Sequence, residues 1–415
     1  MSTVIITFLG HMPRAPEKPA AYVYEDRVYE GYVFPQALRQ FMGHDRMCVF
    51  VTRMARVTSL PYLAALNDPR ITPIDIPDGR AAEERWAIFD KLVGVVEDGD
   101  TVIFDITHGF RSIPFFVFQA IAFLKSARRG VTIARVLYGE FAQGDAPGPV
   151  IDLTDLVPLL DWMSATDQFI ELGNSRPLVA ELEETIATLP PDDEDRQRLA
   201  RFAGALSDVS DSLQLVIADQ AMNAAHRLRL TLRQAHEPLQ RHVRPFLPLV
   251  ERADTAFAAI ALPKAQQTNP WRNLAHERQI IAWYLDRRLL YQAIALAFEW
   301  LLSYGLALLP DGELSREEIR LYLAVINKAN RLGTHRLNDN EQKRLPKARA
   351  ALVRVRDLNR LLDLFAEVSR HRNDLMHASK TVHSEQTPAE REQAIRQVCR
   401  RLAELPLRGG ESGHA

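Results

Sequence analysis

The segment Thr101-Val-Ile-Phe-Asp105-Ile-Thr107-His108-Gly109-Phe-Arg111-Ser112-Ile-Pro114 decides the fold of this chain. Its first five residues form an apolar run that favours a buried strand. Polar residues and a glycine follow, and an apolar helical pattern begins at about Ile113 or Pro114. A buried strand that leads through a polar turn into a helix is typical of the βα unit of a parallel sheet.

Segments of the same kind surround this one over the first 155 or so residues. We predict strands over 4–9, 47–52, 71–76, 101–105, 131–137 and 149–153, and helices over 35–42, 60–67, 81–96 and 113–128. Short strands that alternate with helices indicate a Rossmann-like, mostly parallel α/β sheet covered on both faces.

The remainder of the chain predicts helices only. After about residue 156 there is no convincing strand, and the segments are long, rich in leucine and alanine, and helical in period. The fold class is therefore α/β plus all-α. We divide the chain into a sheet domain (1–170), a helical linker or insertion (171–284), a helical bundle (285–405) and a disordered tail (406–415).

Composition limits the functions that the chain can have. Its 415 residues carry 51 Lys and Arg against 53 Asp and Glu, a net charge of −2. Any site for a polyanion must therefore be a local patch. We predict a cytoplasmic protein, because the sequence has only two cysteines and its N-terminus lacks a signal-peptide pattern. Because the sequence shows no cluster of metal ligands, we also expect no metal. The apolar stretch 289–310 contains Gln292 and Glu299, so we expect a buried helix and no membrane.

The polar residues after the predicted strands form the first candidate site. In open α/β sheets ligands bind beyond the carboxyl ends of the strands, where glycines and a helix N-terminus suit a phosphate. The candidate ligand-binding residues are Gly10, His11, Thr52, Arg53, Thr107, His108, Gly109, Arg111 and Ser112.

An alternative for this site stays open. Thr107 and Ser112 can simply cap a helix, and His108 can satisfy a buried carbonyl. For Asp105 we expect a structural role, in which its carboxylate accepts hydrogen bonds from the N–H groups of the following turn. Neither GxGxxG nor a Walker A motif is present, which argues against an ordinary dinucleotide or ATP site.

The second candidate site is Arg372-Asn373-Asp-Leu-Met-His377, which follows a helical run. Cleavage of RNA without a metal needs a group that moves a proton, for which His377 is suited, and a group that stabilises charge on the phosphate oxygens, for which Arg372 is suited. Asn373 can orient either side chain or the phosphate. The alternative is a solvated helix face with no catalytic role.

Together the two segments resemble the CRISPR-associated CARF–HEPN ribonucleases of type III immunity. The sensor motif Asp-x-Thr-His-Gly-x-Arg is matched in full at 105–111, and the nuclease motif, an arginine, a polar residue and a histidine after a variable gap, is matched at 372–377. The resemblance covers roughly 1–170 and 285–400.

The resemblance implies a function. It implies that a cyclic oligoadenylate binds across a homodimer, or a higher homo-oligomer, of sensor domains and activates metal-independent cleavage of single-stranded RNA, with no cofactor besides this activator. Two alternatives remain: a ligand-sensing regulatory or interaction protein with a non-catalytic helical domain, and a nucleotide-transferring helical domain.

Overall fold

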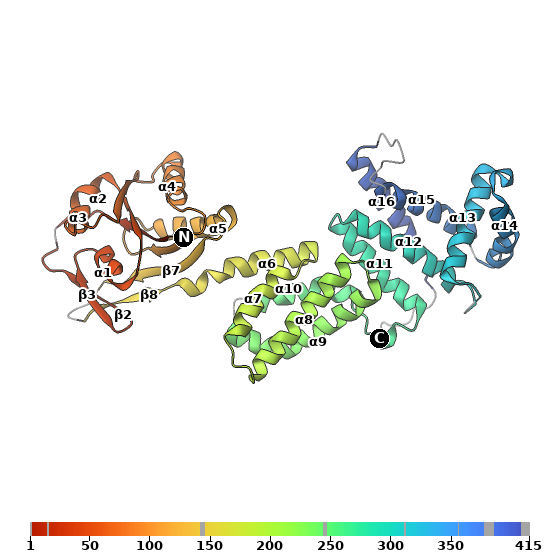
Figure 1. Ribbon diagram of the computed structural model, residues 1–415, viewed down its shortest axis with the longest axis horizontal. Coiled ribbons are helices and arrows are strands. Elements are labelled where there is room, and N and C mark those ends of the chain that lie inside the picture. Colours follow the sequence, from red (N-terminus) through yellow and green to blue (C-terminus); the bar gives the residue numbers. More distant parts are fainter. Residues whose placement is uncertain are drawn as a thin grey trace. The chain divides into compact units, whose positions relative to one another are not determined.

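The computed structural model of the chain describes residues 2–14, 16–141, 146–243, 247–310, 313–355, 357–376 and 386–407. It consists of two compact units, Met1–Asp161 and Trp162–Ala415 (Figure 1). The boundary falls within one helix, α6 (Pro158–Leu172). Of the predicted tail, only Pro406 and Leu407 belong to the described residues.

Unit 1 is an α/β domain. Its strands are β1 (Thr3–Leu9), β2 (Ala20–Tyr24), β3 (Arg27–Gly31), β4 (Arg46–Val51), β5 (Ile71–Asp75), β6 (Thr101–Asp105), β7 (Thr132–Gly139) and β8 (Gly148–Asp152). Its helices are α1 (Phe34–Phe41), α2 (Arg53–Thr58), α3 (Leu60–Ala64), α4 (Ala82–Gly94), α5 (Ile113–Ala127) and the short 3-10 turn η1 (Thr154–Leu156).

The strands form one sheet in the order β3-β2-β8-β7-β6-β1-β4-β5. Pairing is parallel from β7 through β6, β1 and β4 to β5. The hairpin β2–β3 and the β7–β8 pair are antiparallel. This confirms the prediction of a mostly parallel, Rossmann-like sheet, because the parallel part has the strand order of that fold. β5 lies at the edge, where its Pro73 costs no internal hydrogen bond.

The hairpin β2–β3 and the helix α2 were not predicted from the sequence. The hairpin turns at Glu25, which has a φ of 53°. It lies beside β8, far along the sheet from β1, which precedes it in the chain. Helix α2 has six residues, of which only Ala55 is buried, so it has no apolar period to detect. Helix α3 is shorter than predicted because the chain turns at Asn67, whose φ is 48°.

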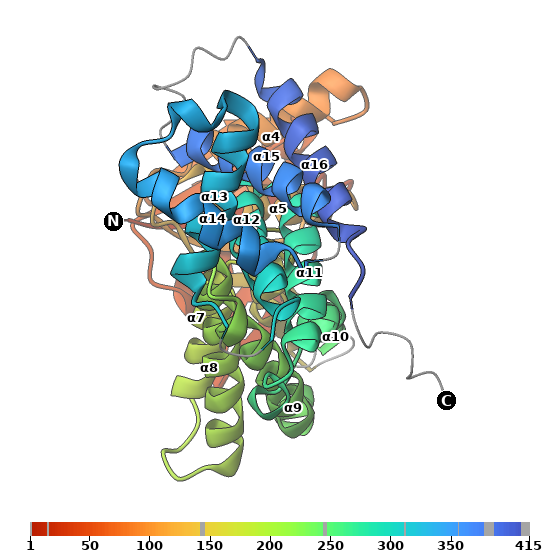
Figure 2. The ribbon, with the colours of Figure 1, turned by 90° about the vertical axis from the view of Figure 1, so that its right-hand side faces the viewer.

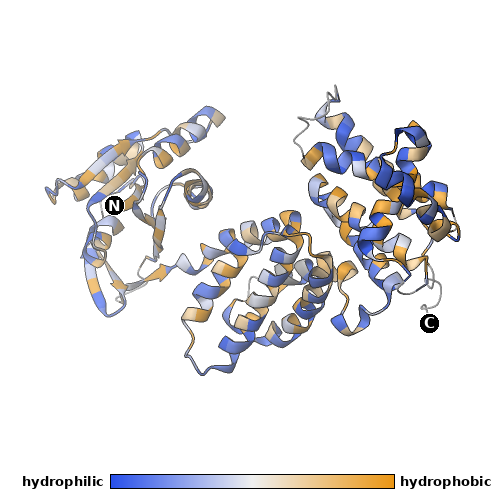
Figure 3. Ribbon diagram, turned by 45° about the vertical axis from the view of Figure 1, so that its right-hand side comes forward, coloured by the Kyte–Doolittle hydropathy of each residue, from blue (hydrophilic) through white to orange (hydrophobic). Residues whose placement is uncertain are grey.

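Helices cover both faces of this sheet. Alternate residues of each central strand point to opposite faces, as the two-residue period of a strand requires. Ile6 and Phe50 pack with α4 and α5 on one face, whereas Ile5 and Val49 pack with α1 and α3 on the other. Figure 3 accordingly shows hydrophobic residues gathered along the strands. The core of unit 1 therefore has two layers, one on each side of β1.

Unit 2 is helical throughout the residues that the structure describes. Its α-helices after α6 are α7 (Arg176–Ala187), α8 (Glu194–Gln214), α9 (Ala218–His242), α10 (Leu247–Phe257), α11 (Pro270–Asp286), α12 (Leu290–Ala307), α13 (Arg316–Leu332), α14 (Asp339–Leu352), α15 (Leu358–Met376) and α16 (Pro388–Ala403). The 3-10 turns η3 (Ala258–Ile260), η4 (Lys264–Gln266) and η5 (Thr334–Arg336) connect them. At the start of α13, Ser315 and Glu318 form a capping box.

One hydrophobic core runs through unit 2, from Trp162 to Leu405. Segments 171–284 and 285–405 thus share their packing, and their division into a linker and a nuclease domain stays a prediction. Helix α12 packs against α11, α13, α15 and α16 (Figure 2). By length and composition α12 could cross a membrane, but 56% of it is buried in the protein and its Trp300 is fully enclosed. We therefore interpret α12 as the expected core helix.

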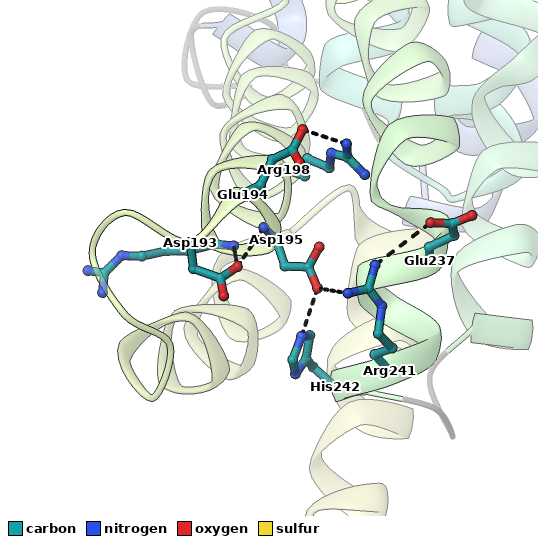
Figure 4. A network of polar contacts seen from close by, with 8 residues as sticks. Asp193, Glu194, Asp195, Arg198, Glu237, Arg241 and His242 are labelled. Atoms are coloured by element: carbon teal, nitrogen blue, oxygen red, sulfur yellow. Dashed lines mark hydrogen bonds and ion pairs between the residues drawn. The ribbon is translucent and has the colours of Figure 1, made fainter.

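A polar clasp joins the beginning of α8 to the end of α9 (Figure 4). The carboxylate of Asp195 is 2.7 Å from Nη1 of Arg241 and 3.0 Å from Nε2 of His242. Asp193 accepts hydrogen bonds from the first N–H groups of α8 and so caps that helix. These contacts hold together the open end of the α8–α9 hairpin, in addition to the apolar packing between the two helices.

Candidate functional site

A glycine of the sensor motif, Gly109, lies next to Gly10, the glycine that follows the first strand, at the middle of the unit 1 sheet. Gly10 follows β1 and Gly109 follows β6, the neighbouring strand. Within the parallel part of the sheet, β4 and β5 lie on one side of β1, and β6 and β7 lie on the other, which makes this the topological switch point. A Cβ added to Gly10 would lie 3.2 Å from the backbone nitrogen of Gly109. Only glycine permits two backbones to approach so closely.

The second pair of predicted residues lies at the same edge. The end of β1 pairs with the end of β4 at Leu9 and Val51, so the residues after the two strands are neighbours. Thr52 is buried and caps α2 by accepting a hydrogen bond from the N–H of Ala55 at 3.3 Å. Arg53 begins α2 and is exposed.

His11, which follows Gly10, is also exposed at this edge. Its Nδ1 lies 3.3 Å from the Oγ1 of Thr58, the last residue of α2. The structure thus brings Gly10, His11, Thr52 and Arg53 to the edge that carries the sensor motif.

Asp105 and Thr107 hold the turn after β6 in place. Asp105 is fully buried and accepts hydrogen bonds from the hydroxyl of Thr7, at 2.5 Å, and from the N–H of Thr107, at 2.8 Å. This confirms the structural role expected for Asp105. Burial raises the pKa of its carboxyl group. The Thr107 hydroxyl accepts a hydrogen bond of 2.8 Å from the N–H of Gly139 and so ties the end of β6 to that of β7.

His108 holds the beginning of helix α1. Its Nε2 accepts a hydrogen bond of 3.0 Å from the N–H of Phe34, the first residue of α1. That nitrogen is therefore unprotonated, and the neutral ring carries its proton on Nδ1. Burial lowers the pKa of His108, which favours this neutral form, although the Asp105 carboxyl opposes the shift. The contact of His108 is thus with a backbone N–H rather than with the buried carbonyl considered from the sequence.

The remaining residues of the sensor motif face solvent. Gly109, Arg111 and Ser112 are exposed at the beginning of α5. Ser112 precedes the first helical residue but makes no side-chain capping hydrogen bond, so the capping alternative does not describe it. With Arg53 and His11, this edge presents two guanidinium groups, an imidazole and the N-terminus of a 15-residue helix, which together suit an anionic ligand.

The second candidate site lies on α15, in unit 2. The guanidinium carbon of Arg372 is 4.7 Å from the ring centroid of Phe298, a buried residue of α12. This cation–π contact holds the side chain of Arg372 against the bundle. Asn373 is exposed beside it. Helix α15 ends at Met376, and His377 lies outside the described residues.

A groove of about 900 Å³ runs beside Arg372 and Asn373, between α13 and α15. Its charged lining consists of Arg320, Lys328, Arg331, Asp363, Arg370 and Arg372. Glu317 pairs with Arg320, and Glu341 pairs with Lys328. Within the described parts of the chain, Arg331 and Arg370 have no ion-pair partner, so the groove is locally basic despite the protein's net negative charge.

The α13 side of this groove was not identified from the sequence. Residues 320, 324, 327, 328 and 331 all line it, and their spacing of three and four residues places them on one helix face. That spacing was a usable signal. His371, next to Arg372, is buried, and burial lowers its pKa. Within the described residues, no three His, Cys, Asp or Glu side chains are grouped to hold a metal ion.

These features define a class of protein: a Rossmann-like domain with a ligand-type switch point, followed by a helical domain with a basic groove. No protein-family model matches the chain. It is 33% identical over 98 residues to the CRISPR-associated protein MJ1674 of Methanocaldococcus jannaschii, a match that covers 22% of this chain and 15% of that relative. This match confirms the resemblance to CRISPR-associated proteins.

A solved structure of similar extent is that of Enterococcus italicus Csm6 bound to cyclic hexa-2'-fluoro-hexa-dAMP. It covers 97% of this chain and 92% of its own, with a TM-score of 0.40 and 10% sequence identity.

Proposed function

We propose that this chain is an endoribonuclease of type III CRISPR antiviral defence that is activated by a cyclic oligoadenylate. The family resemblance of its sensor and nuclease motifs supports this proposal, as does the match to a CRISPR-associated protein. The main observation in support of nuclease activity is the position of Arg372, which lies beside a basic groove and directly before Asn373. The groove gives the negatively charged backbone of RNA a path past Arg372 and Asn373.

In the proposed reaction the 2′-hydroxyl of RNA attacks the adjacent phosphorus. The O2′–P bond forms, the P–O5′ bond breaks, and a 2′,3′-cyclic phosphate and a 5′-hydroxyl result. His377 takes the proton of the 2′-hydroxyl or gives one to the leaving oxygen. Arg372 stabilises the charge that grows on the non-bridging oxygens, and Asn373 orients the phosphate. The nucleophile belongs to the substrate, so this chemistry needs no metal.

The activator is proposed to bind at the switch point of unit 1. Arg53 and Arg111 are exposed there and can pair with phosphate groups of the ring, while Gly10 and Gly109 let it approach the backbone. A ring of repeated nucleotides suits a two-fold axis, so we place it across a homodimer. Cys48 and Cys399 are free and buried, in keeping with a cytoplasmic protein.

The chemistry is tested on a labelled single-stranded RNA. Wild-type protein with a cyclic oligoadenylate should give fragments with a 2′,3′-cyclic phosphate, in the presence of a chelator as well as without it. A substrate with 2′-deoxyribose at the cleavage position should resist. Arg372→Ala should cleave at least about a hundredfold more slowly, the scale on which loss of a charge-stabilising group acts.

Each failure has a distinct meaning. Full cleavage of the 2′-deoxy substrate, or full dependence on magnesium, contradicts the mechanism. Binding of the ligand without any cleavage of RNA would instead favour a regulatory protein with a non-catalytic helical domain.

A further inference from the structure

A second cavity, of about 480 Å³, also borders Arg372. The helix α15 contributes Arg372 to the lining of both this cavity and the basic groove. The rest of the cavity is formed by the α8–α9 turn, by the beginnings of α9 and α13, and by α11 and α12. Its size lies in the range of small-molecule pockets, which is roughly 300–1,000 Å³.

The lining of this cavity differs from that of the groove. One part is apolar, with Val216, Ile217, Ala295 and Leu296. The polar part consists of Asp219, Glu277, Glu299, Ser303, Arg316 and Arg372, so that three carboxyl groups face two guanidinium groups. Such a balance disfavours a second phosphate, since like charges repel. It suits a planar, uncharged group with apolar faces and hydrogen-bond donors on its edge.

Two of the charged groups already have partners. Glu299 accepts hydrogen bonds from Nε and Nη2 of Arg316 at 3.1 and 2.7 Å, and Nη1 of Arg316 donates to Ser303 at 2.9 Å. Glu277, on α11, is different. Its side chain is largely enclosed, and within the described residues its carboxyl group has neither a hydrogen-bond nor an ion-pair partner.

The carboxyl group of Glu277 is partly shielded from water and lines the cavity. Burial raises the pKa of Glu277 to about 7, although nearby Arg316 opposes the shift. An enclosed polar group without a partner loses free energy of hydration that a hydrogen-bonded ligand would restore. A ligand that supplies hydrogen-bond donors favours the ionised state of Glu277, in which both carboxylate oxygens are acceptors.

We propose that this cavity holds the nucleobase next to the cleaved phosphate, and that Glu277 accepts a hydrogen bond from the exocyclic amino group of that base. The inference rests on the proposed nuclease function, because it places the phosphate at Arg372. Adenine, cytosine and guanine carry an exocyclic amino group, whereas uracil presents its O4 carbonyl, an acceptor, in the place of the cytosine amino group. Uracil at the flanking position should therefore be disfavoured.

The first test maps the cleavage sites of activated protein in an RNA library of random sequence. Wild-type protein should cut about tenfold less often where uracil occupies the flanking position, the effect of one charge-assisted hydrogen bond. Glu277→Leu should lose this discrimination, because cleavage beside adenine, cytosine and guanine falls about tenfold toward the level beside uracil. Ala295→Leu, which fills the cavity from its apolar side, should lose it as well. The matched control is Glu184→Gln, an exposed carboxylate of α7, which should keep the wild-type profile.

A second measurement does not depend on cleavage. Wild-type protein should bind cytidine monophosphate more tightly than uridine monophosphate by about tenfold, and Glu277→Leu should bind both equally. Thermal unfolding checks that each variant is folded. An unchanged base profile in a folded, active Glu277→Leu protein overturns the inference but leaves the nuclease function intact. Base-selective binding that depends on Glu277, without cleavage of any RNA, supports the cavity and contradicts the nuclease function.

Discussion

Replacement of Gly109 by alanine should destabilise unit 1 substantially. Gly109 has a φ of 113°, a conformation that costs a side-chain-bearing residue about 1–3 kcal/mol. The added Cβ would also lie 3.1 Å from Cγ1 of Ile113 and 3.3 Å from Cβ of Phe8, and both of these side chains are buried and cannot move freely. Together we expect a loss of about 2–4 kcal/mol, which lowers the Tm of a domain of this size by about 5–15 °C.

Scanning calorimetry of the full chain measures this effect. The matched control is Gly94→Ala at the end of α4, where no atom lies within 4 Å of the added Cβ. That variant should be unchanged or up to about 1 kcal/mol more stable, because alanine favours a helix over glycine. If Gly109→Ala and Gly94→Ala unfold at the same temperature, the close approach of the strand ends is not as described.

Three further changes test unit 2. Arg372→Lys should recover little RNA cleavage relative to Arg372→Ala in the labelled-RNA assay, since an ammonium group lacks the planar fork of the guanidinium group. Near-wild-type activity of Arg372→Lys would contradict a bidentate contact between Arg372 and the phosphate. Glu277→Gln should stabilise the protein more at pH 8 than at pH 5, by at most about 3 kcal/mol in urea denaturation. The reason is that a carboxyl pKa raised to about 7 makes the wild type lose stability as the pH rises from about 4.5 to 7. A difference in unfolding free energy that does not change with pH would count against that pKa shift. Asp195→Ala should lower the Tm of unit 2 by about 2–8 °C, because it removes the contacts to Arg241 and His242. The control Glu237→Gln, at the exposed end of the same network, should change the Tm little.

The parallel part of the sheet could be predicted from the sequence because its strands are continuous apolar runs. The predicted ends of β1, β4, β5, β6, β7 and β8 lie within two residues of the observed ones. The hairpin β2–β3 was missed although its tyrosines and valines alternate on either side of the turn at Glu25. Its place beside β8 depends on contacts far along the chain, which local pattern does not encode.

The candidate sites were predictable to different degrees. Strand order brings the ends of β1, β4 and β6 to one edge, so residues after each strand were sound candidates. The sequence did not show which of these side chains form hydrogen bonds within the protein. Thr107 and His108 accept hydrogen bonds from the backbone N–H groups of Gly139 and Phe34, respectively. Arg53 and Arg111 remain exposed. Arg111 is therefore a cleaner test of ligand binding than His108. The cavity at Glu277 joins five helices and the α8–α9 turn, and no spacing along the chain predicts it.

The central claim is that a ligand at the switch point of unit 1 controls RNA cleavage at Arg372 in unit 2. The most direct measurement is the rate of RNA cleavage as a function of cyclic oligoadenylate concentration, for wild type, Arg111→Ala and Arg372→Ala. Wild type should cleave only with ligand. Arg111→Ala should reach the same maximal rate at about ten- to a hundredfold higher ligand concentration, and Arg372→Ala should bind ligand normally yet stay inactive. Equal cleavage by wild type with and without ligand, or an Arg372→Ala protein that cleaves as fast as wild type, would contradict the claim.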